Sequence, residues 1–362
     1  EYTDTDLGVS LGKPFVAKLN NGKTVVLVGN GYNSDNERAV LFIIDLETGV
    51  LIKKLDTQAG SAAATNGLAS PRGWDLDANG TLDFAYAGDR LGNVWKWDLR
   101  ASNPASWVPA FGTAAAPQPL FTALDASGNR QPITGGMSLG MNARKGDPNF
   151  GKLFVFFGTG QYLVTGDVTD KSVQTWYGLA DNGTQIADRT ALKQRTITAE
   201  STISGNAVRT FSLATAGDMA GKRGWYIDLV PPSGANGERV TTDPRFLGSV
   251  LVTTSIVPTN DICVPGGDGF LNAIDPFSGG STSSVFFDAN SDGLFDSSDM
   301  VKVAGKDVAV GSISPGNNLP SEAILIGNRL IASGTSGQIK SVGANNPIRT
   351  GRIAWREIVR QN

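Results

Sequence analysis

Residues 84–98 read FAYAGDRLGNVWKWD and contain one complete structural unit. An apolar run at residues 84–87 leads into a small-residue turn between Gly88 and Gly92. A second run, residues 93–97, alternates large and smaller side chains and ends at Asp98. Glycine permits the positive backbone angles that tight hairpin turns require. The stretch therefore predicts two antiparallel strands joined by a short turn.

The same order of strand, glycine turn, strand and closing aspartate recurs along the chain. The recurrences are marked by Gly29, Gly88, Gly158, Gly267 and Gly334. Strands are expected at residues 24–28, 40–44, 50–52, 84–87, 93–97, 153–157, 249–254, 270–274, 329–332 and 338–342. Imperfect repeats of a β-meander are typical of propeller blades, which have four strands each.

The repeats predict an all-β fold, a modified seven-bladed β-propeller with insertions that forms a single domain over residues 1–362. The number seven follows from ~50 residues per blade. The glycine marks lie roughly 60 to 70 residues apart, with one interval near double, so insertions are expected on one face. Residues 188–195 fit either a short helix or a strand, and residues 103–117 and 312–320 are expected to be irregular.

Composition excludes several kinds of chemistry. The chain has no histidine, which removes Ser-His-Asp triads and histidine-ligated zinc. Its one cysteine, Cys263, forms no internal disulfide and is expected to be a small buried apolar residue. The net charge of −3 favours neither nucleic acid nor an anionic membrane surface as a partner. No run approaches the ~20 apolar residues of a transmembrane helix. Trp95 and Trp97 share one side of a strand and are expected in the core rather than on a sugar-stacking surface.

Residues 75–83, DLDANGTLD, carry oxygen-bearing side chains at alternate positions. Calcium prefers six to eight oxygen ligands, and an EF-hand loop supplies them at positions one, three, five, seven, nine and twelve. Position twelve would here be Tyr86, which cannot serve, so the loop is predicted to close at position nine. Gly80 stands at position six, where the chain must turn sharply, and Leu82 and Phe84 are expected to anchor the loop to its blade. The predicted ligands are Asp75, Asp77, Asn79, Thr81 (through its carbonyl) and Asp83.

Residues 288–299, DANSDGLFDSSD, repeat this pattern at full EF-hand length. Gly293 again stands at position six, and the twelfth residue is aspartate, as in dockerin-type loops. No helical pattern flanks the loop. The predicted calcium ligands are Asp288, Asn290, Asp292, Leu294 (through its carbonyl), Asp296 and Asp299, so the chain is expected to bind one or two Ca²⁺ ions. An ordinary Asp-Asn-Gly turn at the first loop and a flexible acidic loop at the second are the alternatives without metal.

Residues 75–99, DLDANGTLDFAYAGDRLGNVWKWDL, resemble the central block of the PilY/PilC family of type IV pilus tip proteins. Six further segments are similar to successive blocks of that family: GNGYNS (29–34), FGTGQYL (157–163), QTWYG (174–178), GWYIDL (224–229), GGDGFLNAID (266–275) and RIAWRE (352–357). The resemblance covers nearly the whole chain. It implies the C-terminal β-propeller of a larger secreted protein, whose variable N-terminal region would precede Glu1.

The resemblance implies a role in pilus biogenesis rather than catalysis. Such proteins sit at the pilus tip with minor pilins as partners, outside a Gram-negative cell after export through the periplasm. They promote pilus extension, oppose retraction, and support twitching motility and attachment to host cells or abiotic surfaces. The family's calcium site maps onto residues 75–83, whereas the second loop occurs in only part of the family.

Two other functions remain open from the sequence. Quinoprotein dehydrogenases also combine a propeller with calcium, but they carry a vicinal cysteine pair and regular tryptophan docking motifs. One cysteine and seven scattered tryptophans argue against that enzyme class. A calcium-dependent lectin, in which the metal or a tryptophan face holds a glycan, is the other alternative.

Overall fold

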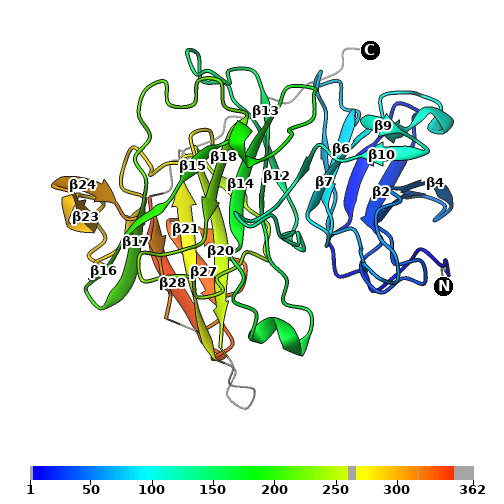
Figure 1. The fold of residues 1–362 in the computed structure, drawn as a ribbon. Coiled ribbons are helices and arrows are strands. Elements are labelled where there is room, and N and C mark those ends of the chain that lie inside the picture. Colours follow the sequence, from blue (N-terminus) through cyan, green and yellow to red (C-terminus); the bar gives the residue numbers. More distant parts are fainter. Residues whose placement is uncertain (1–2, 260–265, 317, 346–362) are drawn as a thin grey trace, which may run out of the picture.

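The computed structural model describes residues 3–259, 266–316 and 318–345. Within these ranges the chain forms five sheets of four to six strands and two separate two-stranded ribbons (Figure 1). Each sheet of four or more strands is a blade, numbered here along the chain. The all-β prediction is confirmed. The only helical elements in this part of the chain are four short 3₁₀ turns: η1 (Pro104–Ser106), η2 (Thr165–Val168), η3 (Arg189–Ala191) and η4 (Ser297–Asp299).

Blades 1 and 2 come from the first third of the chain. Blade 1 is an antiparallel meander of β1 (Phe15–Lys18), β2 (Thr24–Gly29), β3 (Val40–Asp45) and β4 (Leu51–Asp56). Blade 2 contains β5 (Arg72–Trp74), β6 (Phe84–Gly88) and β7 (Asn93–Asp98), with β8 (Val108–Pro109) and β11 (Phe121–Thr122) both paired to β7. The predicted hairpin is confirmed, because β6 and β7 pair with Ala87 opposite Trp95.

Blades 3, 4 and 5 are less regular. Blade 3 contains β12 (Ser138–Met141), β13 (Leu153–Gly158), β14 (Thr175–Asp181) and β18 (Gly224–Asp228), plus β15 (Lys193–Arg195), which is parallel to β18. Blade 4 contains β19 (Arg245–Leu247), β20 (Val250–Pro258), β21 (Gly267–Ile274), β25 (Ser312–Ile313), β17 (Asn206–Phe211) and β16 (Ile197–Ile203). Blade 5 contains β26 (Ile324–Ile326), β27 (Arg329–Ser333), β28 (Ile339–Ala344) and β22 (Phe287–Asp288).

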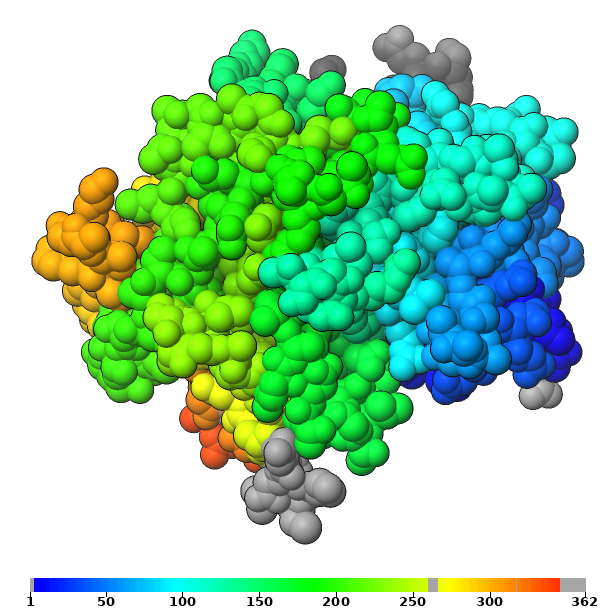
Figure 2. Space-filling model, in the orientation of Figure 1, coloured from blue at the N-terminus to red at the C-terminus, as the bar shows by residue number. Residues whose placement is uncertain are grey.

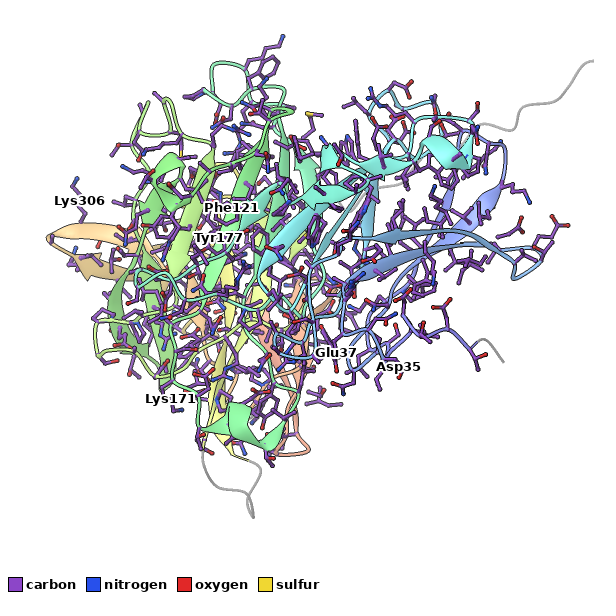
Figure 3. The ribbon with its side chains drawn as sticks, turned by 45° about the vertical axis from the view of Figure 1, so that its right-hand side comes forward. Asp35, Glu37, Phe121, Lys171, Tyr177 and Lys306 are labelled. Carbon is purple, nitrogen blue, oxygen red and sulfur yellow. The ribbon has the colours of Figure 1, made fainter. Side chains whose placement is uncertain are left out.

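The irregular segments differ in part from the sequence predictions. Residues 103–117, expected to be a loop, contain η1, β8 and a ribbon of β9 (Phe111–Thr113) and β10 (Ala116–Gln118). Residues 188–195, which fitted helix or strand, form a 3₁₀ turn followed by β15. Of residues 312–316 and 318–320, which the structure describes, Ser312 and Ile313 form the short strand β25 and the others belong to no strand or helix. A second ribbon, β23 (Met300–Val303) and β24 (Lys306–Ala309), projects from the body of the molecule, and Lys306 stands at its tip (Figures 1 and 3).

The recurring glycines lie where the chain enters the next blade. A Cβ atom on Gly29 would lie 2.1 Å from the Ala69 carbonyl oxygen, and one on Gly88 would lie 2.2 Å from the Ile133 side chain. A Cβ atom on Gly158 would likewise lie 2.2 Å from the Val240 side chain. Glycine is required at these positions because the incoming segment crosses directly over the strand end.

The predicted number of seven blades is not confirmed. An isolated β-bridge marks the start of each blade, at Val9, Leu68, Ile133, Arg239 and Pro320. These starts are farther apart than ~50 residues, because the segments between them hold the β9–β10 and β23–β24 ribbons, β15, and the long β16–β17 hairpin. Insertions therefore lengthen the spacing between blades in the described part of the chain, and the number of seven stays a prediction.

The first strands of the blades face one another at the centre of the molecule. β1 packs against β5, and β5 against β12. An ion-pair network crosses this centre: Asp243 accepts from Lys13 Nζ at 3.0 Å and from Arg72 at 2.8 Å, and Glu322 accepts from Lys13 and Arg245. Because the Gly136 amide also donates to Asp243 at 2.7 Å, the network joins the segments that open all five blades. Beside it lies a cavity of about 430 Å³ lined by Arg72, Trp74, Asp243, Arg245 and Phe246, among others.

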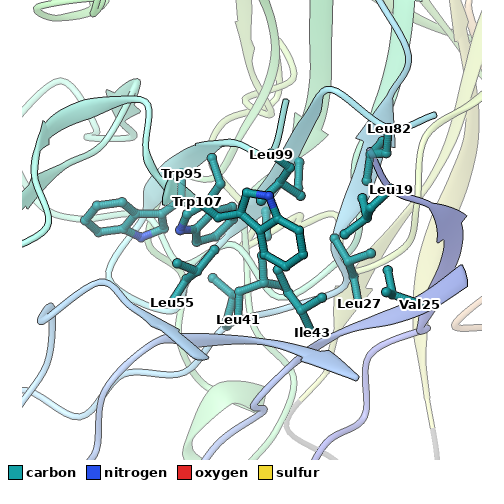
Figure 4. Packing of buried hydrophobic residues seen from close by; sticks show 14 of the residues in the cluster. Leu19, Val25, Leu27, Leu41, Ile43, Leu55, Leu82, Trp95, Leu99 and Trp107 are labelled. Carbon is teal, nitrogen blue, oxygen red and sulfur yellow. The ribbon is translucent and has the colours of Figure 1, made fainter. Parts of the chain in front are cut away.

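Apolar side chains fill the spaces between neighbouring blades. Leu27 and Leu41 of blade 1 and Trp95 of blade 2 belong to one buried cluster (Figure 4). Trp95 and Trp97 are 2% and 0% exposed, so the prediction that they belong to the core is confirmed and neither can stack on a sugar. Between blades 2 and 3, the rings of Phe121 and Tyr177 pack edge to face, with their centroids 5.4 Å apart (Figure 3).

Blades 1 and 2 pack against blade 3 as one continuous body, seen as the blue-to-cyan and green regions of Figure 2. Cys263 lies outside the described residues, so its predicted burial stays a prediction. None of the helices in the described ranges is long and apolar enough to cross a membrane.

Candidate calcium sites

The first acidic loop, residues 75–83, connects β5 to β6 within blade 2. The two strands pair directly below it, with Trp74 opposite Phe84. Two residues of the loop have left-handed backbone angles, Ala78 with φ of 57° and Gly80 with φ of 87°. Such angles fold the chain back on itself, so that side chains at alternate positions point to a common centre.

Three carboxylates meet at that centre. Asp75, Asp77 and Asp83 each place one oxygen so that the three oxygens lie within 4.8 Å of one another. Asp83 is 5% exposed, whereas Asp77 is exposed. Among the ion pairs of the described residues, none involves these three side chains. Carboxylates held this close repel one another unless a cation lies between them.

Backbone amides orient the carboxylates. Asp75 accepts from the Asn79 amide at 3.2 Å and from the Gly80 amide at 2.8 Å. Asp77 accepts from both the amide and the side chain of Asn79, at 3.2 and 3.0 Å. Asp83 accepts from the Leu76 amide at 2.7 Å. These hydrogen bonds fix the three carboxylates beside one another.

The remaining predicted ligands also lie in this loop. Asn79 Oδ1 accepts from the Thr81 amide at 2.8 Å, and the Thr81 hydroxyl contacts both Asn79 and Asn20. Asn20 belongs to the turn between β1 and β2 of blade 1 and is not among the ligands predicted from the sequence. Its only sequence signal is the turn-forming run Asn20-Asn21-Gly22, which does not reveal what the side chain contacts.

Two anchors fix the first loop to the body of the protein. The Leu82 amide donates to the Lys18 carbonyl of blade 1 at 2.8 Å, and the Leu82 side chain is buried between blades 1 and 2. Phe84 is half-buried, with Lys96 Nζ 4.2 Å from its ring centroid. The expected anchoring by both residues is thus observed, and Leu82 reaches the neighbouring blade as well.

The second acidic loop, residues 288–299, runs from β22 to η4. Its first half repeats the hydrogen bonds of the first loop: Asp288 accepts from the Asp292 and Gly293 amides, each at 3.1 Å. Ser291 and Gly293 have φ of 64° and 83°, matching the fourth and sixth positions of the first loop. The local fold predicted from the sequence is therefore shared by both loops.

The second half of this loop differs. Asp299 is fully buried and accepts from the amides of Ala289 at 2.6 Å, Asn290 at 3.2 Å and Asp296 at 3.2 Å. Asp296 caps η4 and accepts a hydrogen bond from the Ser298 amide. This hydrogen bond lowers the pKa of the exposed Asp296 carboxyl. The Asn290 amide group donates to Asp292 and to Ser298.

Carboxylates of the second loop do not cluster as those of the first loop do. Across the described ranges, the one group of three carboxylates that approach within 4.8 Å is that of residues 75–83. Leu294 is exposed and lies at the turn, where its amide donates to Asp292 at 2.8 Å. Both loops offer oxygen ligands of the kind calcium takes, but within the described residues three acids approach one another in the first loop alone.

Comparison with known proteins identifies close relatives. Residues 1–216 match the family model described as the PilY1 beta-propeller domain. The chain is 36% identical, over 98% of its length, to a type IV pilus biogenesis factor PilY1 homolog of Xylella fastidiosa, and 35% identical, over 99%, to type IV pilus biogenesis factor PilY1 of Pseudomonas aeruginosa. It spans 27% and 33% of the length of these two relatives.

A solved structure is similar over almost the entire chain. The crystal structure of the Pseudomonas aeruginosa PilY1 C-terminal domain superimposes with a TM-score of 0.79 and 31% sequence identity. The match covers 95% of this chain and 73% of that domain. The similarity therefore concerns the whole arrangement of blades and not one repeat.

Proposed function

Because this chain belongs to the PilY1 β-propeller family, we propose that it is the propeller part of a type IV pilus biogenesis factor and that it binds calcium at residues 75–83. The observation that carries the calcium proposal is the approach of Asp75, Asp77 and Asp83 to within 4.8 Å in a loop of the expected ligand spacing. The side chains of Asn79 and the carbonyl of Thr81 would complete the oxygen set.

Calcium would stabilise the propeller by neutralising the repulsion among the three acids. A ligand that binds only the folded form stabilises it by ~2.7 kcal/mol at a hundredfold excess over the dissociation constant. The loop contacts blade 1 through Leu82 and belongs to blade 2, so that stabilisation would extend to the interface between these blades.

Calorimetric titration with calcium chloride tests the binding step. The wild-type chain and Asp75→Ala would be compared with Asp125→Asn as a matched control. Asp125 also heads a glycine turn and accepts from the Ser127 and Asn129 amides, both at 2.8 Å, but it has no carboxylate cluster around it. Asp75→Ala should weaken binding by more than tenfold while Asp125→Asn binds like wild type. Equal affinity of all three would rule out the first loop as the calcium site.

The second loop, residues 288–299, is proposed as a weaker calcium site. Its ligands would be Asp288, Asn290, Asp292, Leu294, Asp296 and Asp299. Because Asp299 already accepts three amides and Asn290 is bonded to Asp292 and Ser298, calcium must compete with hydrogen bonds that the protein makes. In the same calorimetric titration, a second binding step of lower affinity that Asp292→Ala abolishes would support this site.

In the cell, the domain would act at the pilus tip together with minor pilins, outside the cell and in contact with host or abiotic surfaces. The support is membership of the family and the names of its relatives, type IV pilus biogenesis factors. Calcium in the first loop would stabilise the state that favours pilus extension and opposes retraction, and would thereby support attachment and twitching. A ligand shifts such a balance only through its different affinity for the two states.

Surface pilus counts test this cellular role. Asp75→Ala should reduce the number of surface pili in a strain with an intact retraction motor. Deletion of the motor should return the number of pili in this variant to that of the wild type. Asp83→Lys, which places an ammonium group near the three-acid centre, tests whether charge neutralisation alone mimics calcium. Wild-type pilus numbers for Asp75→Ala in the first strain would show that the loop does not control retraction.

A further inference from the structure

A side chain from outside the first acidic loop reaches it from the neighbouring blade. Asn20 lies between β1 and β2 of blade 1, and its Oδ1 accepts from the Thr81 hydroxyl at 2.8 Å. The backbone bond from the Leu82 amide to the Lys18 carbonyl runs beside it at 2.8 Å. The loop of blade 2 is therefore joined to the β1–β2 turn of blade 1 by one backbone and one side-chain hydrogen bond.

The Thr81 hydroxyl has two acceptors and only one proton. Asn79 Oδ1 also lies within hydrogen-bond distance of that hydroxyl, and it already accepts from the Thr81 amide. A hydroxyl donates one hydrogen, so it can serve Asn79 or Asn20 but not both at once. Asn79 is a proposed calcium ligand, whereas Asn20 is not.

We propose that Asn20 is a positioning residue of the calcium site: it accepts the hydrogen bond of the Thr81 hydroxyl when calcium binds Asn79, and so couples metal binding to the contact between blades 1 and 2. This inference rests on the proposed calcium binding at residues 75–83. A cation on Asn79 Oδ1 uses the lone pairs that otherwise accept from Thr81, and the hydroxyl then donates to Asn20. Partners of this kind orient the groups that hold a metal.

The second acidic loop provides a contrast. There the Asn206 side chain, from the start of β17, donates to the Ala289 carbonyl at 2.9 Å. Ala289 offers no side-chain ligand, and its carbonyl is not among the proposed ligands. That bond need not change when metal binds, whereas in the first loop the Thr81 hydroxyl has two acceptors to choose between.

The test compares Asn20→Ala with Asn21→Ala, a substitution in the same turn. Within the described residues, Asn21 accepts the local Lys23 amide alone, at 3.0 Å, and it serves as the matched control. The parent protein for this test carries Asp292→Ala, which removes a proposed ligand of the second loop, and both variants are made in it. Calcium chloride would be titrated calorimetrically into each of the three proteins. Losing one hydrogen bond should make calcium binding about threefold to tenfold weaker in Asn20→Ala. Asn21→Ala should match the parent protein.

Hydrogen exchange gives a second readout that a merely structural role would not change. Calcium should slow amide exchange in the peptide covering residues 15–28 in the parent and in Asn21→Ala, but not in Asn20→Ala. Thr81→Val, which keeps the backbone carbonyl and the branched shape, should reproduce the loss. The double variant Asn20→Ala, Thr81→Val should bind no more weakly than either single variant.

The outcomes separate this inference from the proposed function. If the parent protein binds calcium and Asn20→Ala matches it in affinity and protection, the coupling is wrong while the calcium site stands. If neither the parent protein nor its Asp77→Asn variant binds calcium, both the calcium site and the role of Asn20 are wrong. Should Asn20→Ala fail to fold, Thr81→Val decides on the same two measurements.

Discussion

The two acidic loops begin alike and end differently. In each, the first aspartate accepts the amides of the fifth and sixth residues, and the fourth and sixth residues have positive φ. In each, the closing aspartate accepts the amide of the second residue. The first loop, however, closes at Asp83 after nine residues and the second at Asp299 after twelve.

Loop length determines what the closing acid does. Asp299 is buried and accepts three backbone amides, so its charge is held by the protein itself. Within the described chain, Asp83 accepts the Leu76 amide alone, and one of its oxygens faces Asp75 and Asp77. A closing acid with few protein donors remains available to a cation, which is why the first loop is expected to bind calcium more tightly.

The largest expected effect is that of Asp299→Ala. Three backbone amides, of which that of Ala289 is buried, would lose their buried acceptor. This should lower the free energy of unfolding by about 2–4 kcal/mol, with or without calcium. Asp83→Ala should cost only about 1 kcal/mol in chelator and considerably more in calcium. Urea denaturation of both variants in each condition measures this. Similar losses for the two variants in chelator would contradict the distinction between the loops.

Glycine substitutions test whether the loops share one backbone. Gly80 and Gly293 have φ of 87° and 83°, and a Cβ on either would meet no atom within 4 Å. Alanine should therefore destabilise each loop only through its backbone angle, by about 1–2 kcal/mol. Thermal unfolding in chelator should give nearly equal losses. A much larger loss at one site would show that the two turns are not equivalent.

The effect of Asp77→Asn on the stability of the protein should have opposite signs in chelator and in calcium. In chelator it relieves repulsion at the three-acid centre and should raise stability by a few tenths of a kcal/mol. In calcium it removes a charged ligand and should lower stability by about 1 kcal/mol. Asp292→Asn, at the loop without the cluster, should show no gain in chelator. Melting temperatures with and without calcium measure both, and a loss in chelator for Asp77→Asn would refute the repulsion argument.

The smallest effect concerns pH. Hydrogen bonding to Ser298 lowers the pKa of Asp296 below its usual range. A depressed folded-state pKa contributes stability above the unfolded value of 3.8, and that stability is lost as pH falls through the folded value. Asp296→Asn should therefore slightly flatten the acid limb of stability below about pH 4 in chelator. NMR titration of Asp296 checks the direction, and an ordinary pKa would contradict it.

Sequence alone determined the features that depend on neighbouring residues. The strands of the β6–β7 hairpin, the left-handed glycines and the ligand spacing of residues 75–83 all follow from local backbone geometry and period-two patterning. The burial of Trp95 and Trp97 followed from the same patterning. Such features form wherever a short segment has the right residues, so they could be predicted without knowing the fold.

Tertiary structure decided what depends on segments distant in the chain. The β16–β17 hairpin joins blade 4 through β25, and the network of Lys13, Asp243 and Glu322 joins the blade starts. Sequence did not place Asn20 against Thr81, nor did it place the β9–β10 and β23–β24 ribbons between the blades. These contacts join residues tens to hundreds of positions apart, and no local pattern specifies which segments will meet. Only folding brings Asn20 to the first acidic loop.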